Sequence, residues 1–296
     1  MLGSGRLVVC GVGLIGGSLA AAVRDHVTGG VIGVDADDAA IAGAEARGLI
    51  DGRGWPEDLS PEDLVLVAVP TLAVAGVIEQ LWDAESGILA GGAVVTDAAS
   101  VKRPVIDAAM AVCGRIPANL VPGHPIAGSE RSGVSAARAD LFRDHRVILT
   151  PTSEAAPAAV DRVRVLWERA GAEVCTMDVA EHDRVLALTS HLPHLLAFAL
   201  VDTLGRAPEH EAVFRFAAGG FRDFTRIASS DPVMWSDIFT ANAVAVGASL
   251  DRLEAELAEL RGLLEAGDRD GLRELFARAK ALRDAHVAGA GAPSHD

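Results

Sequence analysis

Residues 122–133 gather several side chains that could take part in catalysis into one short segment of this 296-residue chain. The segment reads PGHPIAGSERSG, so His124, Ser129 and Glu130 lie among glycines and prolines, directly after the short run Asn119-Leu120-Val121. Glycine and proline fix the course of a backbone, which predicts a loop held in one conformation. Such loops at the ends of buried strands carry the chemistry of many α/β enzymes, and histidine exchanges protons near neutral pH. The alternative is an ordinary polar loop whose histidine caps a backbone group.

Further histidines and arginines could complete a site around such a base. An arginine guanidinium binds a carboxylate through two parallel hydrogen bonds, which suits an anionic substrate. The candidates are His191, His194, Arg131 and Arg226. Of these, His191 is explained more simply as a packed helical residue than as a catalytic one.

The first half of the chain alternates apolar runs of strand length with helical patterns. Continuous apolar runs are typical of parallel strands buried on both faces, and they occur at residues 7–10, 31–34, 64–69 and 93–96. Amphipathic segments separate them at residues 14–26, 36–47 and 72–82. This alternation predicts a Rossmann-type, doubly wound and mostly parallel sheet with helices on both faces. Two more strands, at 147–149 and 173–175, flank a helix at about 155–170 and are expected to extend this domain.

The pattern changes near residue 178 and becomes almost wholly helical. The helical segments cover about 179–205, 209–228, 232–266 and 270–285, and Pro193 should kink the first of them. We therefore predict a sheet domain over 1–178, an all-helical domain over 179–288 and a disordered tail over 289–296. Five leucines recur at helical spacing, at 250, 253, 257, 260 and 264. They predict helix packing within the domain or across a dimer interface, and we expect a homodimer.

A glycine motif follows the first strand at once and opens the first helix. In Gly11-Val12-Gly13-Leu14-Ile15-Gly16, the first glycine permits a tight turn and the second lets a pyrophosphate approach the backbone. The third permits close packing of helix against strand, and the helix N-terminus offers unpaired N–H groups to the phosphates. The alternative is a glycine turn with no ligand. The position between strand and helix favours a dinucleotide site formed by Gly11, Gly13, Leu14, Ile15 and Gly16.

An acidic residue at the end of the second strand selects between the two nicotinamide dinucleotides. Asp35 lies 19 residues after Gly16, where a carboxylate accepts hydrogen bonds from the adenosine ribose and repels a 2′-phosphate. The residues that follow are acidic and include no arginine, so the sequence predicts NAD as the cofactor. Val69 and Pro70, at the end of a third strand, should border the same cleft.

Composition excludes several classes of partner. The net charge of −15 argues against a nucleic-acid partner or an anionic membrane surface. Three cysteines, at 10, 113 and 175, match neither disulfide nor metal-ligand spacing, so we expect free thiols and no metal. The N-terminus lacks the features of a signal peptide, and the apolar stretch 185–201 contains two histidines and a proline, which makes it a poor membrane span. We expect a cytoplasmic protein.

Taken together, these segments resemble the prephenate and arogenate dehydrogenase family of tyrosine biosynthesis. The resemblance runs from residue 7 to about residue 239. It rests on residues 11–19 (GVGLIGGSL), 96–102 (TDAASVK), 123–133, 147–151 (VILTP), 190–194 (SHLPH), 219–226 (GGFRDFTR) and 231–235 (DPVMW).

The resemblance implies a reaction, a cofactor and residue roles. Family members use NAD to oxidise and decarboxylate a cyclohexadienol. His124 matches the histidine that takes the proton of the ring hydroxyl as hydride leaves the same carbon, and loss of the ring carboxylate as carbon dioxide then restores aromaticity. Ser100 matches a residue that contacts the same hydroxyl and the nicotinamide region.

The implied substrate-binding residues come from the loop and from the helical domain. His194 matches a pocket histidine, Arg226 the arginine that clamps a substrate carboxylate, and Trp235 a residue near the pocket entrance that can come from the partner subunit. Glu130 and Asp223 match acidic residues implicated in gating and ion pairing around the pocket. The complete set is His194, Arg226, Glu130, Ser129, Asp223 and Trp235.

The chain departs modestly from the family pattern, and alternatives stay open. Ala98 and Ala99 occupy a position where members often carry a glycine. We expect no regulatory domain after the helices and no chorismate mutase segment before the first strand, so any feedback by tyrosine would act at the active site. Prephenate is favoured as the substrate, with arogenate as the alternative. More remote are a β-hydroxyacid dehydrogenase, whose helical-domain lysine has no counterpart but Lys280, and a non-catalytic NAD sensor.

Overall fold

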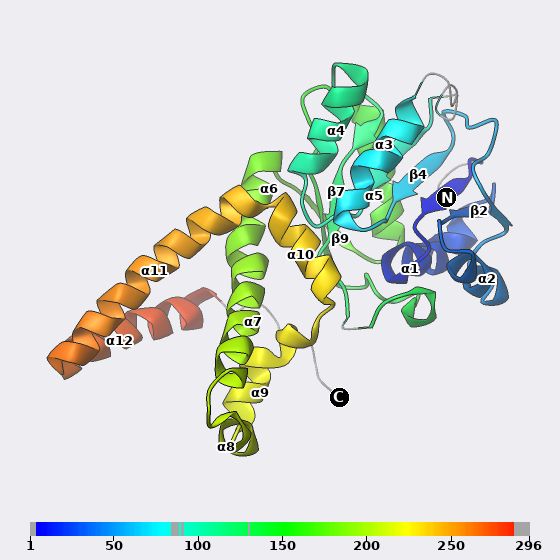
Figure 1. Ribbon diagram of the computed structural model, residues 1–296. Coiled ribbons are helices and arrows are strands. Elements are labelled where there is room, and N and C mark those ends of the chain that lie inside the picture. Colours follow the sequence, from blue (N-terminus) through cyan, green and yellow to red (C-terminus); the bar gives the residue numbers. More distant parts are fainter. Residues whose placement is uncertain (1–3, 84–88, 90–91, 130, 287–296) are drawn as a thin grey trace. The chain divides into compact units, whose positions relative to one another are not determined.

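A computed structural model describes residues 4–83, 89, 92–129 and 131–286. Its first layer is a six-stranded parallel sheet (Figure 1) in the order β3-β2-β1-β4-β5-β6. The strands are β1 (Leu7–Cys10), β2 (Val31–Val34), β3 (Gly52–Arg53), β4 (Leu64–Val67), β5 (Val94–Asp97) and β6 (Leu120–Val121). This is the strand order of a Rossmann fold, so the predicted doubly wound sheet is confirmed.

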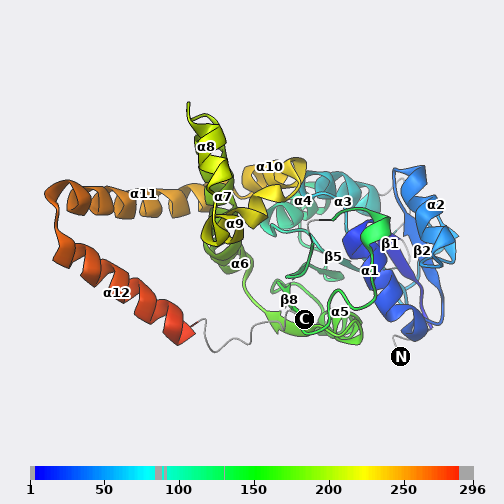
Figure 2. The same ribbon diagram turned by 90° about the horizontal axis from the view of Figure 1, so that it is seen from below.

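Alternation along the strands sends apolar side chains into two cores, one on each face of the sheet. Leu7 and Val9 of β1 point into one core, and Val8 points into the other. The first core is covered by α1 (Leu14–Val23), α2 (Asp38–Ala46) and α5 (Pro157–Arg169), and the second by α3 (Val74–Trp82) and α4 (Arg103–Cys113). Figure 2 shows α3 and α4 on the face of the sheet opposite α1 and α5. Burial on both faces is why these strands read as continuous apolar runs.

A second, three-stranded sheet carries residues 123–125 of the segment that contains His124. Its strands are β7 (Gly123–Pro125), β8 (Arg146–Leu149) and β9 (Glu173–Thr176), with β7 antiparallel and β9 parallel to β8. The prediction of a loop throughout 122–133 was therefore wrong for residues 123–125. Glycine and proline hid a strand that proline tolerates because β7 lies at the edge of its sheet. The strands expected at 147–149 and 173–175 do form, but in this second sheet.

The helices after the second sheet begin with a long apolar run that a π-helical turn interrupts. The run consists of α6 (Val179–Leu186), the π-turn Ala187–His191 and α7 (Leu192–Gly205). Asp178 caps α6 by accepting hydrogen bonds from the amides of Ala180 and Glu181. Pro193 lies in the first turn of α7, where proline needs no hydrogen-bond partner for its nitrogen. The distortion expected at Pro193 thus takes the form of a π-turn just before it.

Shorter helices follow α7: α8 (His210–Arg215), α9 (Gly219–Thr225), a 3₁₀ turn at Arg226–Ser229 and α10 (Pro232–Ala241). The predicted helix at 232–266 is in fact two helices, because α10 ends at Ala241 and α11 (Ala243–Ala266) begins after Asn242. The Asn242 side-chain amide donates to the carbonyl of Asp183 at 2.8 Å. This buried hydrogen bond fixes the junction between α10 and α11 against α6.

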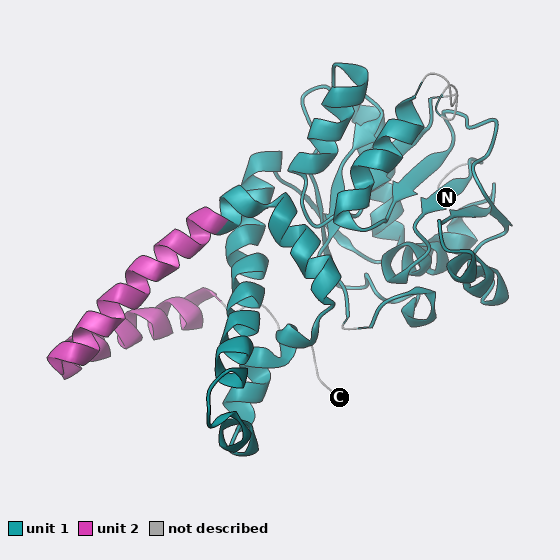
Figure 3. Cartoon of the chain, viewed as in Figure 1, with its two compact units in different colours: residues 1–246 teal, residues 247–296 magenta. Residues whose placement is uncertain are grey.

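Contacts divide the chain into two compact units (Figure 3), residues 1–246 and 247–296. The first holds both sheets and helices up to α10, and the second holds most of α11 and α12 (Arg269–His286). The predicted boundary at 178/179 stays a prediction. By contacts, α6 to α10 belong to the same compact unit as the two sheets. The predicted tail at 289–296 lies outside the described residues.

By length and composition alone, the run Val179–Gly205 is long and apolar enough to cross a membrane, and α10 with α11 would be a second such span if counted as one. Core helices of soluble proteins pass the same test. In this run His182, Asp183 and His191 are buried and hydrogen-bonded to other parts of the chain. Those polar contacts fit a helix packed against protein.

Candidate active site

The glycine loop after β1 has the geometry that a dinucleotide requires. Gly11 has a φ of +94°, and a Cβ there would lie 2.4 Å from the carbonyl oxygen of Ala68. A Cβ on Gly16 would lie 2.0 Å from the Gly11 oxygen, so α1 packs too closely on β1 for any side chain. Gly13 faces open space and is the N-cap of α1 with no side chain bonded there. The N–H groups of the first turn, which includes Leu14 and Ile15, therefore remain available to phosphates.

Asp35 is held in place beside this loop by two backbone amides. Its Oδ2 accepts from the amide of Val12 at 2.9 Å, and its Oδ1 accepts from the amide of Asp37 at 2.9 Å. Each carboxylate oxygen has a second lone pair, so both can still accept hydrogen bonds from a ribose. The residues present thus fit a nicotinamide dinucleotide with a free 2′-hydroxyl.

Val69 and Pro70 follow β4, and Ser100 follows β5, at the carboxyl edge of the sheet. The 3₁₀ turn Thr71–Ala73 after Pro70 contacts α10. Val101, next to Ser100, packs in a small core with Trp235 and Ile238 of α10. The helical segment thereby closes over the edge of the sheet at which ligands bind in folds of this type.

A buried ion pair anchors the strand that carries His124. Asp97 and Lys102 are both fully buried, and the Lys102 ammonium donates to Asp97 Oδ2 and to the carbonyl of Gly123. Asp97 also accepts from the amides of Ala99 at 2.9 Å and of Gly123 at 3.2 Å. Every partner of Asp97 is a donor and both partners of Lys102 are acceptors, so the pair is ionic. It fixes the end of β5, the following loop and the start of β7 relative to one another.

His124 lies next to a second buried histidine. Its Nδ1 is 2.9 Å from Nε2 of His182, whose own Nδ1 is 2.8 Å from Oδ1 of Asp183. Burial, and then the charges of His182, Lys102 and His191, hold the pKa of His124 well below its ordinary value. Burial also lowers the pKa of His182, although its hydrogen bond to Asp183 opposes this. Both imidazoles are therefore neutral at pH 7 and His124 can act as a base.

Asp183 is the fixed end of this row of side chains. Its Oδ1 accepts from the amide of Lys102 at 2.8 Å and its Oδ2 from the amide of Arg103 at 2.9 Å, at the N-terminus of α4. Burial raises the pKa of Asp183, but the hydrogen bonds from His182 and these amides outweigh burial and lower the pKa. The carboxylate is therefore ionised.

The implied substrate-pocket residues of the helices lie together. The ring of His194 stacks on that of Trp235 with centroids 3.6 Å apart, and its Nδ1 donates to the carbonyl of Ser190 at 2.8 Å, which leaves Nε2 as an acceptor. Burial lowers the pKa of His194 and the nearby charge of Arg226 adds to this. Trp235 is 6 % exposed and packs within its own chain. His191 is buried and contacts Asn242 at 3.2 Å, which favours the packing role expected for it.

Other predicted residues lie on the surface. Ser129 is exposed, and its hydroxyl bonds the amide and carbonyl of Arg131, so it shapes the loop. Asp223 is exposed on α9, one helical turn before Arg226. Glu130 lies outside the described residues.

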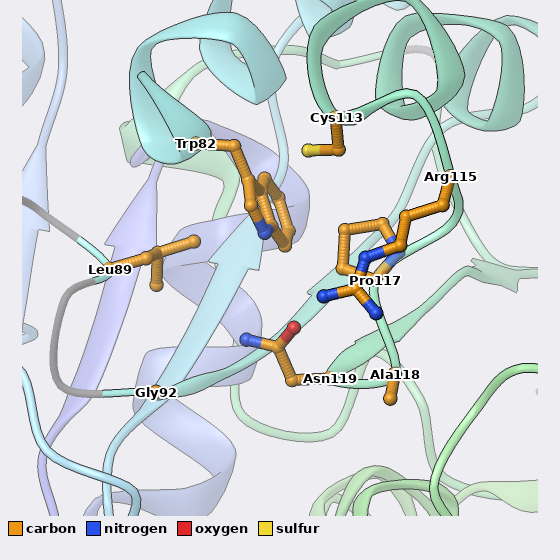
Figure 4. Close-up of a pocket in the computed structure, with 8 residues that line it drawn as sticks. All are labelled: Trp82, Leu89, Gly92, Cys113, Arg115, Pro117, Ala118 and Asn119. Atoms are coloured by element: carbon orange, nitrogen blue, oxygen red, sulfur yellow. The ribbon is translucent and has the colours of Figure 1, made fainter. Parts of the chain in front are cut away.

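A pocket lies at the opposite edge of the sheet, before the starts of β5 and β6 (Figure 4). Its lining residues are Trp82, Leu89, Gly92, Cys113, Arg115, Pro117, Ala118 and Asn119. Burial raises the pKa of the Cys113 thiol, so it is no ready nucleophile. This pocket is separate from the glycine loop and from His124, which lie at the carboxyl ends of the strands.

A Rossmann sheet, a dinucleotide loop with an acidic ribose acceptor and a neutral, half-buried histidine together define an NAD-dependent oxidoreductase. Comparison with known sequences gives the family. The sequence model of "Prephenate dehydrogenase, nucleotide-binding domain" matches residues 19–176, and that of "Prephenate dehydrogenase, dimerization domain" matches residues 178–278. The chain belongs to the prephenate dehydrogenase family.

Individual relatives agree over nearly the whole chain. Prephenate dehydrogenase of Bacillus subtilis is 37% identical over 94% of this chain and 75% of its own. Cyclohexadienyl dehydrogenase of Zymomonas mobilis is 34% identical over 94% of both chains. Among solved structures, prephenate dehydrogenase of Aquifex aeolicus, in complex with hydroxyphenyl propionate and NAD+, superposes with a TM-score of 0.86 at 36% identity, over 95% of this chain and 98% of that one.

Sequence reasoning missed the residues behind His124. Lys102 and Asp97 were recognised only as part of a motif, and His182 and Asp183 were not singled out at all. A signal existed for the lysine, since the chain has only two lysines and Lys102 follows an apolar strand. For His182 and Asp183 the sequence carries little signal, because they lie within a run of four charged or titratable residues, Glu181 to Arg184, that reads as an exposed helix face.

Proposed function

We propose that the chain catalyses the NAD-dependent oxidative decarboxylation of prephenate to 4-hydroxyphenylpyruvate. When bound, NAD supplies the hydride acceptor. His124 accepts the proton of the ring hydroxyl as hydride leaves the same carbon, and Ser100 contacts that hydroxyl. Loss of the ring carboxylate leaves an aromatic phenolate, to which His124 returns the proton. One base and correct positioning suffice, because the restored aromatic ring drives the final step.

The observation that carries this proposal is the position of a neutral imidazole at the carboxyl edge of a dinucleotide-binding sheet. His124 is half-buried on β7, and β7 is fixed to the end of β5 by the Asp97–Lys102 pair. A base that must face a nicotinamide needs such a rigid mount.

We assign binding of the substrate's charged groups to the helical residues. Arg226 clamps a carboxylate, with His194 and Trp235 forming the adjoining pocket wall. Ser129 and Asp223 border the entrance, and for Glu130 we keep only the role in gating or ion pairing that the family resemblance implies. Arg226 lies close enough to His194 for the guanidinium charge to lower the pKa of that imidazole, which supports this arrangement.

The test is turnover by the purified chain with NAD and either prephenate or arogenate. The two substrates differ only in a keto or an amino group on the side chain, and we propose prephenate. A kcat/KM for prephenate above that for arogenate supports this, the reverse order selects arogenate, and no turnover of either overturns the proposed function.

Asp35 is expected to decide the choice of dinucleotide. In Asp35→Asn the charge-assisted bonds to the ribose are lost, so NAD binding weakens by about 10- to 100-fold, as expected for hydrogen bonds to a charged group, and NADP is discriminated against less. Asparagine can still accept from one of the two backbone amides, which limits damage to the loop. Isothermal titration calorimetry with each dinucleotide measures the ratio of the NAD and NADP dissociation constants. Glu45→Gln, at an exposed carboxylate near the end of α2 and away from the ribose site, is the control and should leave both affinities unchanged. Equal NAD affinity for Asp35→Asn and wild type would contradict the assignment.

We propose that the chain forms a homodimer through its helical region and acts in the cytoplasm. Large apolar side chains of α11 and α12 are half or more exposed in the single chain, among them Leu257, Leu264, Phe276 and Leu282. A monomer rarely leaves so many apolar side chains in water. Sedimentation equilibrium should give twice the chain mass, and Leu264→Asp should shift the protein toward monomer. A wild-type monomer at micromolar concentration would contradict the dimer.

A further inference from the structure

We propose that His182 and Asp183 form a relay with His124, in which His182 receives the second proton of the His124 ring while His124 holds the substrate's proton. This inference rests on the proposed function, because it assigns to residues outside the substrate pocket a task in the same proton transfer. It stands on the continuous row of contacts from Asp183 through His182 to His124.

The direction of each hydrogen bond follows from the ionised end of the row. Asp183 accepts from two backbone amides and is a carboxylate, so it can only accept from Nδ1 of His182. A neutral His182 with its proton on Nδ1 has a bare Nε2, which must accept from Nδ1 of His124. His124 is therefore protonated on Nδ1, and its Nε2 carries the lone pair. The row of contacts thus selects the tautomer that a general base needs.

The surroundings of His124 make a positive charge on its own ring costly. Burial contributes most to this cost by lowering the pKa of His124, and the three groups that face the ring, His182, Lys102 and His191, all lower that pKa further. His182 differs because Asp183 bonds directly to it, while Asp97 also favours its charged form and Lys102 opposes it. A positive charge is thus better placed on His182 than on His124.

The step is balanced without any further reactant. The substrate O–H bond breaks, its electron pair stays on oxygen as hydride leaves the carbon, and the proton joins Nε2 of His124. The proton on Nδ1 of His124 crosses to Nε2 of His182, whose Nδ1–H stays bonded to Asp183. When carbon dioxide has left and a phenolate has formed, both protons return. His182 is thus a positioning residue that acts through His124.

The decisive variant is His182→Gln. A glutamine oxygen near the former Nε2 position can still accept from Nδ1 of His124, so tautomer and geometry persist, but the amide cannot take up a proton. We expect kcat to fall by roughly 10- to 100-fold, toward the low end of what a general base contributes, with KM and the Kd for NAD changed less than about twofold. Without His182, the positive charge must stay on His124 beside Lys102, which lowers the pKa of the base. The acid limb of kcat/KM, which reports that pKa, should therefore move to lower pH. His145→Gln, an exposed histidine bonded to the carbonyl of Arg143, is the matched control.

Two outcomes would overturn the relay: wild-type kcat in His182→Gln, or a lower kcat with an unmoved acid limb, which indicates a purely structural role. Nitrogen NMR of histidine-labelled protein without substrate gives an independent readout. Both His124 and His182 should carry their protons on Nδ1, with signals assigned from the variants that lack each ring. A proton on Nε2 of His124 would contradict the relay whatever the substrate is. Absence of turnover in the wild type, by contrast, would refute the proposed function and leave the tautomer result standing.

Discussion

Replacing His124 by asparagine is expected to lower kcat by about 10²- to 10⁴-fold, the usual contribution of a general base. The asparagine amide nitrogen lies near the position of Nδ1 and can still donate to Nε2 of His182, so the row of buried contacts is kept. What is lost is the Nε2 lone pair that takes the substrate's proton. The measurement is steady-state NADH formation with saturating substrate and NAD.

The affinity for NAD provides the internal control for His124→Asn. His124 lies on the second sheet, whereas the dinucleotide is held by the glycine loop and Asp35. The Kd for NAD should therefore change less than about twofold, in keeping with sites that share no contacts. A variant with near-wild-type turnover would show that another group is the base.

Replacing Lys102 by methionine is expected to cost about 3–5 kcal/mol of folding free energy, the usual result of removing one partner of a buried ion pair. Methionine has similar length but no charge, so the carboxylate of Asp97 and the carbonyl of Gly123 lose their donor inside the core. Urea denaturation followed by circular dichroism measures the loss. Since β7 is tied to this pair, turnover should fall as well.

The neighbouring residue offers a matched control. Arg103 forms an ion pair with Asp107 at 2.7 Å, but the two side chains are 70% and 57% exposed. Arg103→Ala should therefore change the free energy of unfolding by less than about 1 kcal/mol, as is usual for surface pairs. If Lys102→Met were as mild as Arg103→Ala, the buried pair would not be the anchor of the site.

The Rossmann sheet could be predicted because each of its main strands leaves the same signal in the local sequence, a short apolar run followed by a turn and a helix. Strands β1, β4 and β5 are buried on both faces, β2 is buried on one face and partly buried on the other, and all four read as apolar runs, with the glycine loop between β1 and α1. The two-residue strand β3 and the edge strand β7 were missed because their residues carry no such pattern. Gly123 and Pro125 resemble a turn, and only pairing with β8, more than twenty residues later, makes them a strand.

The candidate site was predictable only in part, for a different reason. His124, Asp35 and the glycines have types and spacings that indicate chemistry by themselves. The relay depends on α6 bringing His182 and Asp183 beside β7 and the start of α4, a contact between distant segments that spacing does not encode. The break at Asn242 has the same origin, since the bond of its side chain to Asp183 exists only in the folded protein.

The most direct test of the central claim is the stoichiometry of a single reaction mixture containing the purified chain, NAD and prephenate. NADH, carbon dioxide and 4-hydroxyphenylpyruvate should appear in equal amounts, and His124→Asn should slow all three alike. Formation of carbon dioxide without NADH, or no product from either prephenate or arogenate, would contradict the assignment of this site to oxidative decarboxylation.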